Sequence, residues 1–112
     1  MKTNPELKNL IRELKRLSKK ENVDIWNAIA KQLEKSTRRR PAVNLHRINK
    51  YCKDNETIII PGKVLSSGSL DKKVAVAALQ FSEKAKEKIK NHLTIQELMK
   101  KNPKGSKIRI IK

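Results

Sequence analysis

The sequence predicts an α/β fold, in which an N-terminal helical hairpin precedes a unit of alternating short strands and short helices. Apolar residues recur at helical spacing as far as Leu33, a β-branched run follows at residues 57–60, and further helix-start signals come after that run. We divide the 112 residues into a basic helical hairpin at residues 1–37 and an α/β core at residues 38–112. We expect the two parts to fold as one unit.

Two amphipathic helices are expected at the start of the sequence. Asn4, Pro5 and Glu6 supply a capping side chain, a proline at the first helical position and an acid in the first turn. Apolar positions at helical spacing follow at Leu7, Leu10, Ile11, Leu14 and Leu17. A second helix begins at Asp24, and its apolar face comprises Ile25, Trp26, Ile29, Ala30 and Leu33. We expect both apolar faces to pack in the core.

A different pattern follows the hairpin. Three arginines before Pro41 predict an extended stretch, because a residue that precedes proline avoids the helical region. Asn44 can cap a short helix over residues 45–52, and Asp54-Asn55 predicts a turn.

Two strands are expected in the middle of the chain. The run at residues 57–60 is typical of a strand buried on both faces. Residues 61–62, a Pro-Gly pair, are expected to interrupt this strand, which resumes at residues 63–65. A loop at residues 66–69 leads to a second strand over residues 73–81.

Short helices and a last strand complete the prediction. Ser82 and Glu83 open one helix, and a capping-box pattern at residues 94–97 opens another. Residues 102–103, an Asn-Pro pair, stop the second helix, and residues 107–112 predict a terminal strand.

Positive charge is spread over the whole chain. The 28 Lys and Arg residues outnumber the 11 Asp and Glu residues, which gives a formal net charge of +17. Residues 1–56 hold 15 basic against 7 acidic residues, and residues 57–112 hold 13 against 4. Because such a field attracts polyanions and works against the compact state, nucleic acid is the expected partner.

The composition narrows the class of ligand and the compartment. Trp26, Tyr51 and Phe81 are the only aromatic residues, which disfavours a single-strand reader that stacks successive bases. Phosphate, sugar and shape contacts to a duplex or a folded RNA fit better. Cys52 is the only cysteine, which fits a reducing compartment. The sequence has no signal-peptide pattern and no membrane-length apolar run, so we expect a cytoplasmic protein without a membrane partner.

Catalytic and metal-ligating patterns are missing from the sequence. Gly62-Lys63 and Gly68 come in the wrong order for a phosphate-binding loop, so their glycines suit either close approach of RNA or a tight turn. Neither His46 nor His92 has a carboxylate or thiolate at ligand spacing. We therefore expect no enzyme activity, metal, cofactor or small-molecule substrate.

Basic residues in three regions are the candidates for RNA contact, since the planar guanidinium and the ammonium group both suit phosphate. The first region comprises Arg38, Arg39, Arg40, Arg47 and Lys50. The second comprises Lys63, Lys72 and Lys73, around the loop. The third comprises Lys107, Arg109 and Lys112, on the terminal strand.

Residues 58–82, which read IIIPGKVLSSGSLDKKVAVAALQFS, resemble the large-subunit ribosomal protein family eighteen-e of archaea and eukaryotes. The similarity extends to residues 3–5, the Trp26 region, residues 43–45 and 47–48, and residues 102–110, so it covers nearly the whole chain. The short length is similar to that of archaeal members. Ser66 departs from the pattern, in which glycine is expected after Lys63-Val64-Leu65.

The resemblance implies a structural constituent of the large ribosomal subunit, which binds large-subunit ribosomal RNA beside neighbouring ribosomal proteins. It also implies an irregular three-layered α/β superhelix, shared with the bacterial fifteen family of the large subunit. The residues alone leave open a free basic nucleic-acid-binding module of the chromatin or RNA-chaperone type, and more remotely an RNA-processing enzyme. A ribosomal protein is expected to prefer RNA over DNA, because it uses 2′-hydroxyl groups and folded RNA shape.

Overall fold

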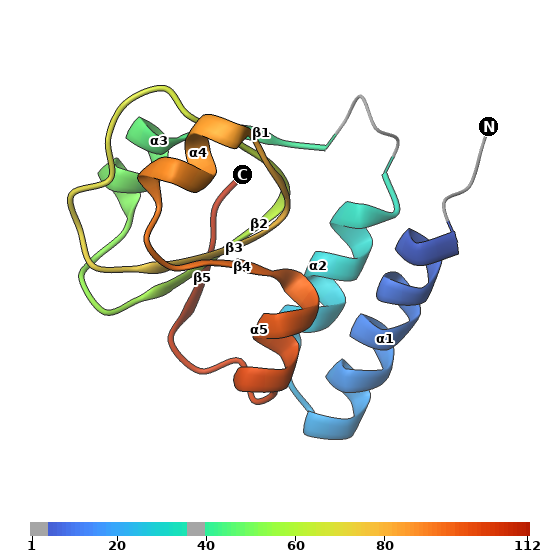
Figure 1. The fold of residues 1–112 in the computed structure, drawn as a ribbon. Helices are drawn as coiled ribbons and strands as arrows, with labels where there is room; N and C mark the ends of the chain where they lie inside the picture. The colour runs from blue at the N-terminus through green and yellow to red at the C-terminus, as the bar shows by residue number, and fades with distance from the viewer. Residues whose placement is uncertain (1–4, 36–39) are drawn as a thin grey trace.

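The computed structural model describes residues 5–35 and 40–112 (Figure 1). Helices α1 (Pro5–Glu21) and α2 (Ile25–Leu33) form the N-terminal hairpin. The α/β unit follows as β1 (Ala42–Asn44), α3 (Leu45–Tyr51), β2 (Thr57–Leu65), β3 (Ala75–Phe81), α4 (Glu83–Lys88), β4 (His92–Thr94), α5 (Ile95–Lys101) and β5 (Ile108–Ile110). The predicted α/β class with an N-terminal helical hairpin is confirmed.

The hairpin forms where α1 ends at a left-handed residue. Asn22 has a φ of 54°, a conformation that asparagine tolerates better than most residues. The Val23 N–H donates to the Ser18 carbonyl oxygen (3.1 Å), which closes the last turn. Trp26 on α2 is fully buried, and its indole Nε1 donates to the Pro103 carbonyl oxygen (2.7 Å). The expectation that this side chain packs in the core is confirmed.

A parallel sheet forms the centre of the molecule. Its strand order is β1-β2-β3-β4, and β5 also pairs with β2. β1 pairs with residues 63–65 of β2, whereas β5 pairs with residues 57–59. Since β3 pairs along the other side of β2, β1 and β5 border the same side one after the other.

Helices cover both faces of this sheet, so the molecule has three layers (Figure 1). Ile58 and Ile60 pack with residues of α3 and α4, whereas Ile59 and Ala77 pack with residues of α1, α2 and α5. This division follows from the strand, in which successive side chains point to opposite faces. The prediction that residues 57–60 are buried on both faces is confirmed.

Pro61 and Gly62 lie inside β2 rather than interrupting it, which corrects the prediction. The pairing with β3 shifts register between Ile60 and Lys63, and this shift accommodates the irregularity. Gly62 fits because a Cβ atom there would lie 2.0 Å from the Pro41 carbonyl oxygen. The Lys63 N–H donates to that same oxygen (3.0 Å), so the segment entering β1 is bound to β2.

Three other differences concern short segments. The strands β1 and β4 are absent from the sequence-based prediction; each has three residues and leads directly into a helix. Asn44 precedes α3 as expected, but its side chain does not cap the helix. Its Oδ1 accepts from the Ser67 N–H (3.3 Å) and so holds the loop after β2. The strand predicted over residues 73–81 begins at Ala75.

Candidate nucleic-acid interface

Helix α3 presents Arg47 and Lys50 to solvent, and we call these two side chains the α3 cations. They lie three positions apart and therefore share one side of the helix. Leu45 and Ile48 are fully buried in the core. The helix is thus fixed by its apolar residues and leaves both cations exposed.

Arg47 joins α3 to the segment after β5. Its Nη2 donates to the carbonyl oxygen of Lys112 (2.8 Å). Its guanidinium carbon lies 5.5 Å from the centroid of the Tyr51 ring, and Lys50 Nζ lies 5.4 Å from the same centroid. Candidates from the first and third predicted regions therefore meet at this helix.

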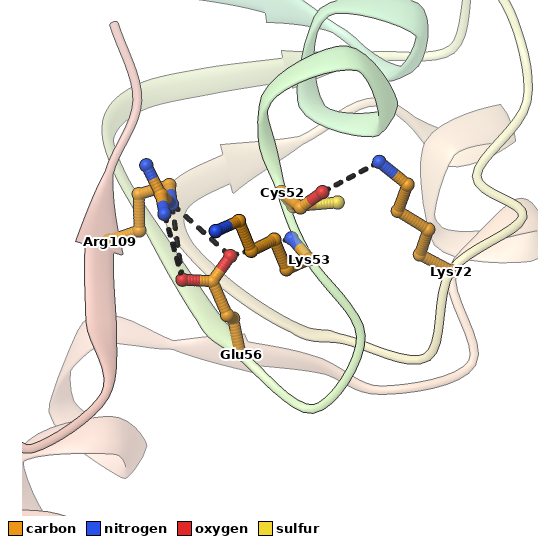
Figure 2. Close-up of polar contacts among 5 residues, drawn as sticks. All are labelled: Cys52, Lys53, Glu56, Lys72 and Arg109. Atoms are coloured by element: carbon orange, nitrogen blue, oxygen red, sulfur yellow. Dashed lines mark hydrogen bonds and ion pairs between the residues drawn. The ribbon is translucent and has the colours of Figure 1, made fainter.

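Lys72, from the second region, closes the C-terminal end of α3. Its Nζ donates to the carbonyl oxygen of Asn49 (2.7 Å). It also donates to the carbonyl oxygen of Cys52 (2.6 Å) (Figure 2). A cation at this position stabilises carbonyl groups that have no partner within the helix. Burial raises the pKa of the Cys52 thiol, and the Lys72 ammonium partly offsets that rise. The Lys72 ammonium is therefore engaged by the fold itself.

Arg109 on β5 is held by Glu56 (Figure 2). Its Nε lies 3.2 Å and 3.1 Å from the two carboxylate oxygens, and its Nη2 lies 3.1 Å from Glu56 Oε2. The Lys53 N–H also donates to the carboxylate (2.6 Å). These hydrogen bonds hold the pKa of the Glu56 carboxyl below its usual value, and the one from Arg109 has the largest effect. The ion pair fixes the Arg109 side chain against Glu56 and reduces its availability for phosphate.

Three lysine candidates remain exposed near these tethered residues: Lys73, Lys107 and Lys112. The Lys73 N–H donates to Asp54 Oδ1 (2.9 Å), which fixes its backbone. The Lys107 carbonyl oxygen accepts from the Thr57 N–H (3.1 Å) where β5 joins β2. Their backbones are held by the fold while their side chains face solvent.

Lys63 borders a different feature, a hollow of about 420 Å³ beside the carboxyl ends of β3 and β4. Lys86 of α4 lines the same hollow with Gln80, Phe81 and Thr94. Lys86 is absent from the predicted set, because its proximity to Lys63 follows from the β3–α4 connection rather than from sequence spacing.

The glycines of the predicted loop serve packing within the protein. Gly68 has a φ of 93°, and a Cβ atom there would lie 2.6 Å from the Cβ of His46. Lys88 Nζ donates to the carbonyl oxygens of Ser66 (2.9 Å) and Gly68 (3.1 Å). Of the two roles left open for Gly62 and Gly68, the structure supports close packing and a tight turn. Lys88 is a further lysine that the sequence did not single out.

The arginine run is described only in part. Arg38 and Arg39 lie outside the described residues. Arg40 is half-buried, and its Nε is buried without a hydrogen-bond partner among the described residues.

Within residues 5–35 and 40–112, no group of three or more His, Cys, Asp and Glu residues is placed to hold a metal ion. None of the helices described there is long and apolar enough to cross a membrane.

Comparison with known proteins identifies the family. Residues 1–112 match the family model described as "Ribosomal protein 60S L18 and 50S L18e". The chain belongs to this family. The resemblance of residues 58–82 to the eighteen-e family is thereby confirmed.

Three archaeal proteins named large ribosomal subunit protein eL18 illustrate the similarity. The protein of Methanoregula boonei is 50% identical over 115 residues, which cover 99% of this chain and 95% of the relative. That of Archaeoglobus fulgidus is 46% identical over 114 residues, covering 98% and 97%. That of Methanothermobacter thermautotrophicus is 45% identical over 114 residues, covering 98% and 94%. The archaeal character implied by the short length is confirmed.

In this L18e chain, some candidates for RNA contact have side chains that donate hydrogen bonds within the protein, whereas others have side chains exposed to solvent. Lys72 and Arg109 donate hydrogen bonds within the protein, and Arg47 does so with one nitrogen. Among the predicted candidates, the exposed lysines are Lys50, Lys63, Lys73, Lys107 and Lys112. Of these, Lys50 belongs to α3, Lys107 and Lys112 lie on either side of β5, and Lys73 precedes β3.

Proposed function

We propose that this protein binds ribosomal RNA through the α3 cations and the exposed lysines beside them. Membership of the L18e family makes the chain a structural constituent of the large ribosomal subunit, and therefore of the cytoplasmic ribosome. The observation that carries the proposed contact is the placement of Arg47 and Lys50 on the outer side of an anchored helix. The proposed role is noncatalytic, and neighbouring ribosomal proteins are the further proposed partners.

Two kinds of cation contribute to this surface. Exposed ammonium groups keep their donors available for phosphate oxygens, and each phosphate that they neutralise releases counterions. Lys72 and Arg109 fix the end of α3 and the strand β5, which carry the exposed groups. Contacts to phosphate then position the RNA without reading its sequence, which suits recognition of a folded ribosomal RNA by shape.

The contact itself is tested by the salt dependence of RNA binding. Replacing Arg47 and Lys50 together by glutamine should lower affinity for a large-subunit ribosomal RNA fragment. The slope of log K against log salt should decrease by about one unit per lost phosphate contact. Replacing Lys8 and Arg12 on α1 by glutamine removes the same charge from another exposed site and provides the matched control. Equal losses in both double variants would show that only net charge matters.

The arginine run is tested in the same assay. Replacing Arg38, Arg39 and Arg40 by glutamine should also flatten the salt dependence, by about one unit of slope per lost contact. An unchanged slope would remove this run from the proposed interface.

Assembly into the subunit is tested by sedimentation of a native lysate on a sucrose gradient. The protein should travel with large subunits and remain there after a moderate-salt wash. Recovery at the top of the gradient, or together with DNA, would instead support the free nucleic-acid-binding module.

A further inference from the structure

Tyr51 stands out because it is a large apolar side chain left at the surface. Among residues 5–35 and 40–112, it is the exposed large hydrophobic residue, with 48% of its surface accessible. The other two aromatic residues belong to the interior: Trp26 is fully buried, and Phe81 packs against the core cluster beside α3 and α4. Packing within the fold therefore accounts for Trp26 and Phe81 but leaves half of Tyr51 exposed.

The ring lies in a basic environment. The guanidinium of Arg47 and the ammonium of Lys50 both lie over the ring, 5.5 Å and 5.4 Å from its centroid, within the range of cation–π attraction. The Arg47 guanidinium is also hydrogen-bonded to the Lys112 carbonyl oxygen, so it does not move freely. The helix that carries the ring is fixed by buried Ile48 and by the Lys72 hydrogen bonds at its end.

This combination of groups matches the chemistry of one nucleotide. An aromatic ring offers a face on which any base can stack. A base that stacks there replaces the cation over that face, and the displaced cation is then placed to bind a phosphate beside the base. Within a continuous duplex the bases are stacked on each other, so only an unpaired base that leaves the stack can reach the ring.

We propose that Tyr51 is a stacking platform for an unpaired nucleobase of the bound RNA, with Arg47 and Lys50 at the flanking phosphates. This inference rests on the proposed function, because it takes RNA as the ligand of the α3 cations. It adds to that function a preference for RNA with a bulged or flipped-out nucleotide. A single such platform is compatible with a chain that lacks the successive aromatic residues of a single-strand reader.

The test uses three RNA duplexes that differ at one position: fully paired, with a single bulged adenosine, and with an abasic ribose in the bulge. The full-length protein should prefer the bulged adenosine over both other duplexes. Tyr51→Leu should weaken binding to the bulged adenosine by roughly fivefold or more, the range measured for loss of one base–aromatic stack. It should leave binding to the paired duplex unchanged, whereas Tyr51→Phe should retain the preference.

A second measurement does not depend on a variant. A 5-iodouridine placed in the bulge should photocrosslink to the protein at Tyr51, as mapped by mass spectrometry of the digested complex.

The outcomes separate this inference from the proposed function. Equal affinity of the unmodified protein for all three duplexes, with a normal salt slope, overturns the platform and leaves phosphate binding intact. An equal loss for all duplexes in Tyr51→Leu, or a crosslink mapped elsewhere, also overturns it. If the unmodified protein binds none of the three RNA duplexes, both proposals are overturned.

Discussion

The Glu56 carboxylate binds both Arg109 of β5 and the backbone just after α3. It accepts hydrogen bonds from Arg109 and from the Lys53 N–H, and these lower its pKa. A carboxyl whose pKa is lowered by folding stabilises the folded state at pH values above its pKa in the unfolded chain. That contribution is lost as the pH falls through the lowered pKa of the folded state.

The corresponding prediction concerns acid unfolding. In Glu56→Gln the decline in stability between about pH 5 and pH 3 should be smaller than in the unmodified protein, because one titrating group has been removed. Urea unfolding at a series of pH values measures this slope. Glu83→Gln is the matched control, since the Glu83 side chain is 91% exposed and lies 3.8 Å from its partner Lys86. Parallel pH profiles for Glu56→Gln and the unmodified protein would contradict the assignment.

The sequence predicts where the candidate cations lie along the chain but not what each of them binds. The abundance of cations, and their placement on a short helix, a loop and a terminal strand, follow from the sequence. Their partners do not: Lys72 binds a carbonyl 20 residues away, and Arg109 binds a carboxylate 53 residues away. Such pairs are created by the packing of separate elements, so spacing along the chain cannot separate a tethered cation from a free one.

At the scale of elements, β2 depends on a close backbone contact at Gly62. The Pro41 carbonyl oxygen occupies the space that a side chain would fill, and it accepts from the Lys63 N–H. The entry into β1, and with it the position of α3, is fixed at this point because β1 leads directly into that helix.

Gly62→Ala should therefore be strongly destabilising. A methyl group that meets backbone rather than a flexible side chain forces β1 away from β2, with an expected cost of about 3 kcal/mol in the free energy of unfolding. Denaturant unfolding measures this loss. Lys63→Ala, at the next position with an exposed side chain, should change stability little. A Gly62→Ala variant as stable as Lys63→Ala would show that the chain entering β1 moves without cost.

Helices and strands could be predicted from the sequence where a pattern of neighbouring residues is strong. The capping box of α5 forms as expected, since Thr94 Oγ1 accepts from the Glu97 N–H and Glu97 Oε1 accepts from the Thr94 N–H. β1 and β4 have three residues each, too few for a strand periodicity to develop before the following helix. Their existence is decided by pairing with β2 and β3, which is a property of the whole sheet.

For the molecule as a whole, we propose that the hairpin and the α/β core unfold together. One core cluster contains Leu14 of α1 and Trp26 of α2 together with Ile59 of β2 and Leu98 of α5. Removing the hairpin would expose one face of the sheet, so neither part is expected to retain a complete core alone.

This proposal predicts a single unfolding transition. Trp26 is the only tryptophan, so its fluorescence reports on the hairpin, whereas far-UV circular dichroism reports on all elements. The two signals should give the same midpoint in urea. A fluorescence midpoint at a lower urea concentration than the circular dichroism midpoint would show that the hairpin unfolds before the core.

Because β1 and β5 pair along the same side of β2, that side is completed late in synthesis of the chain. β1 covers one half of that side and precedes β2, whereas β5 covers the other half and follows β2 by more than forty residues. A nascent chain that has exposed β1 through α5 outside the exit tunnel still carries a bare parallel edge at residues 57–59. Open strand edges favour pairing with other chains, and electrostatic attraction would also bring this basic chain to RNA before its sheet is closed. The last strand to leave the tunnel therefore ends the interval in which the newly made protein is most prone to aggregate.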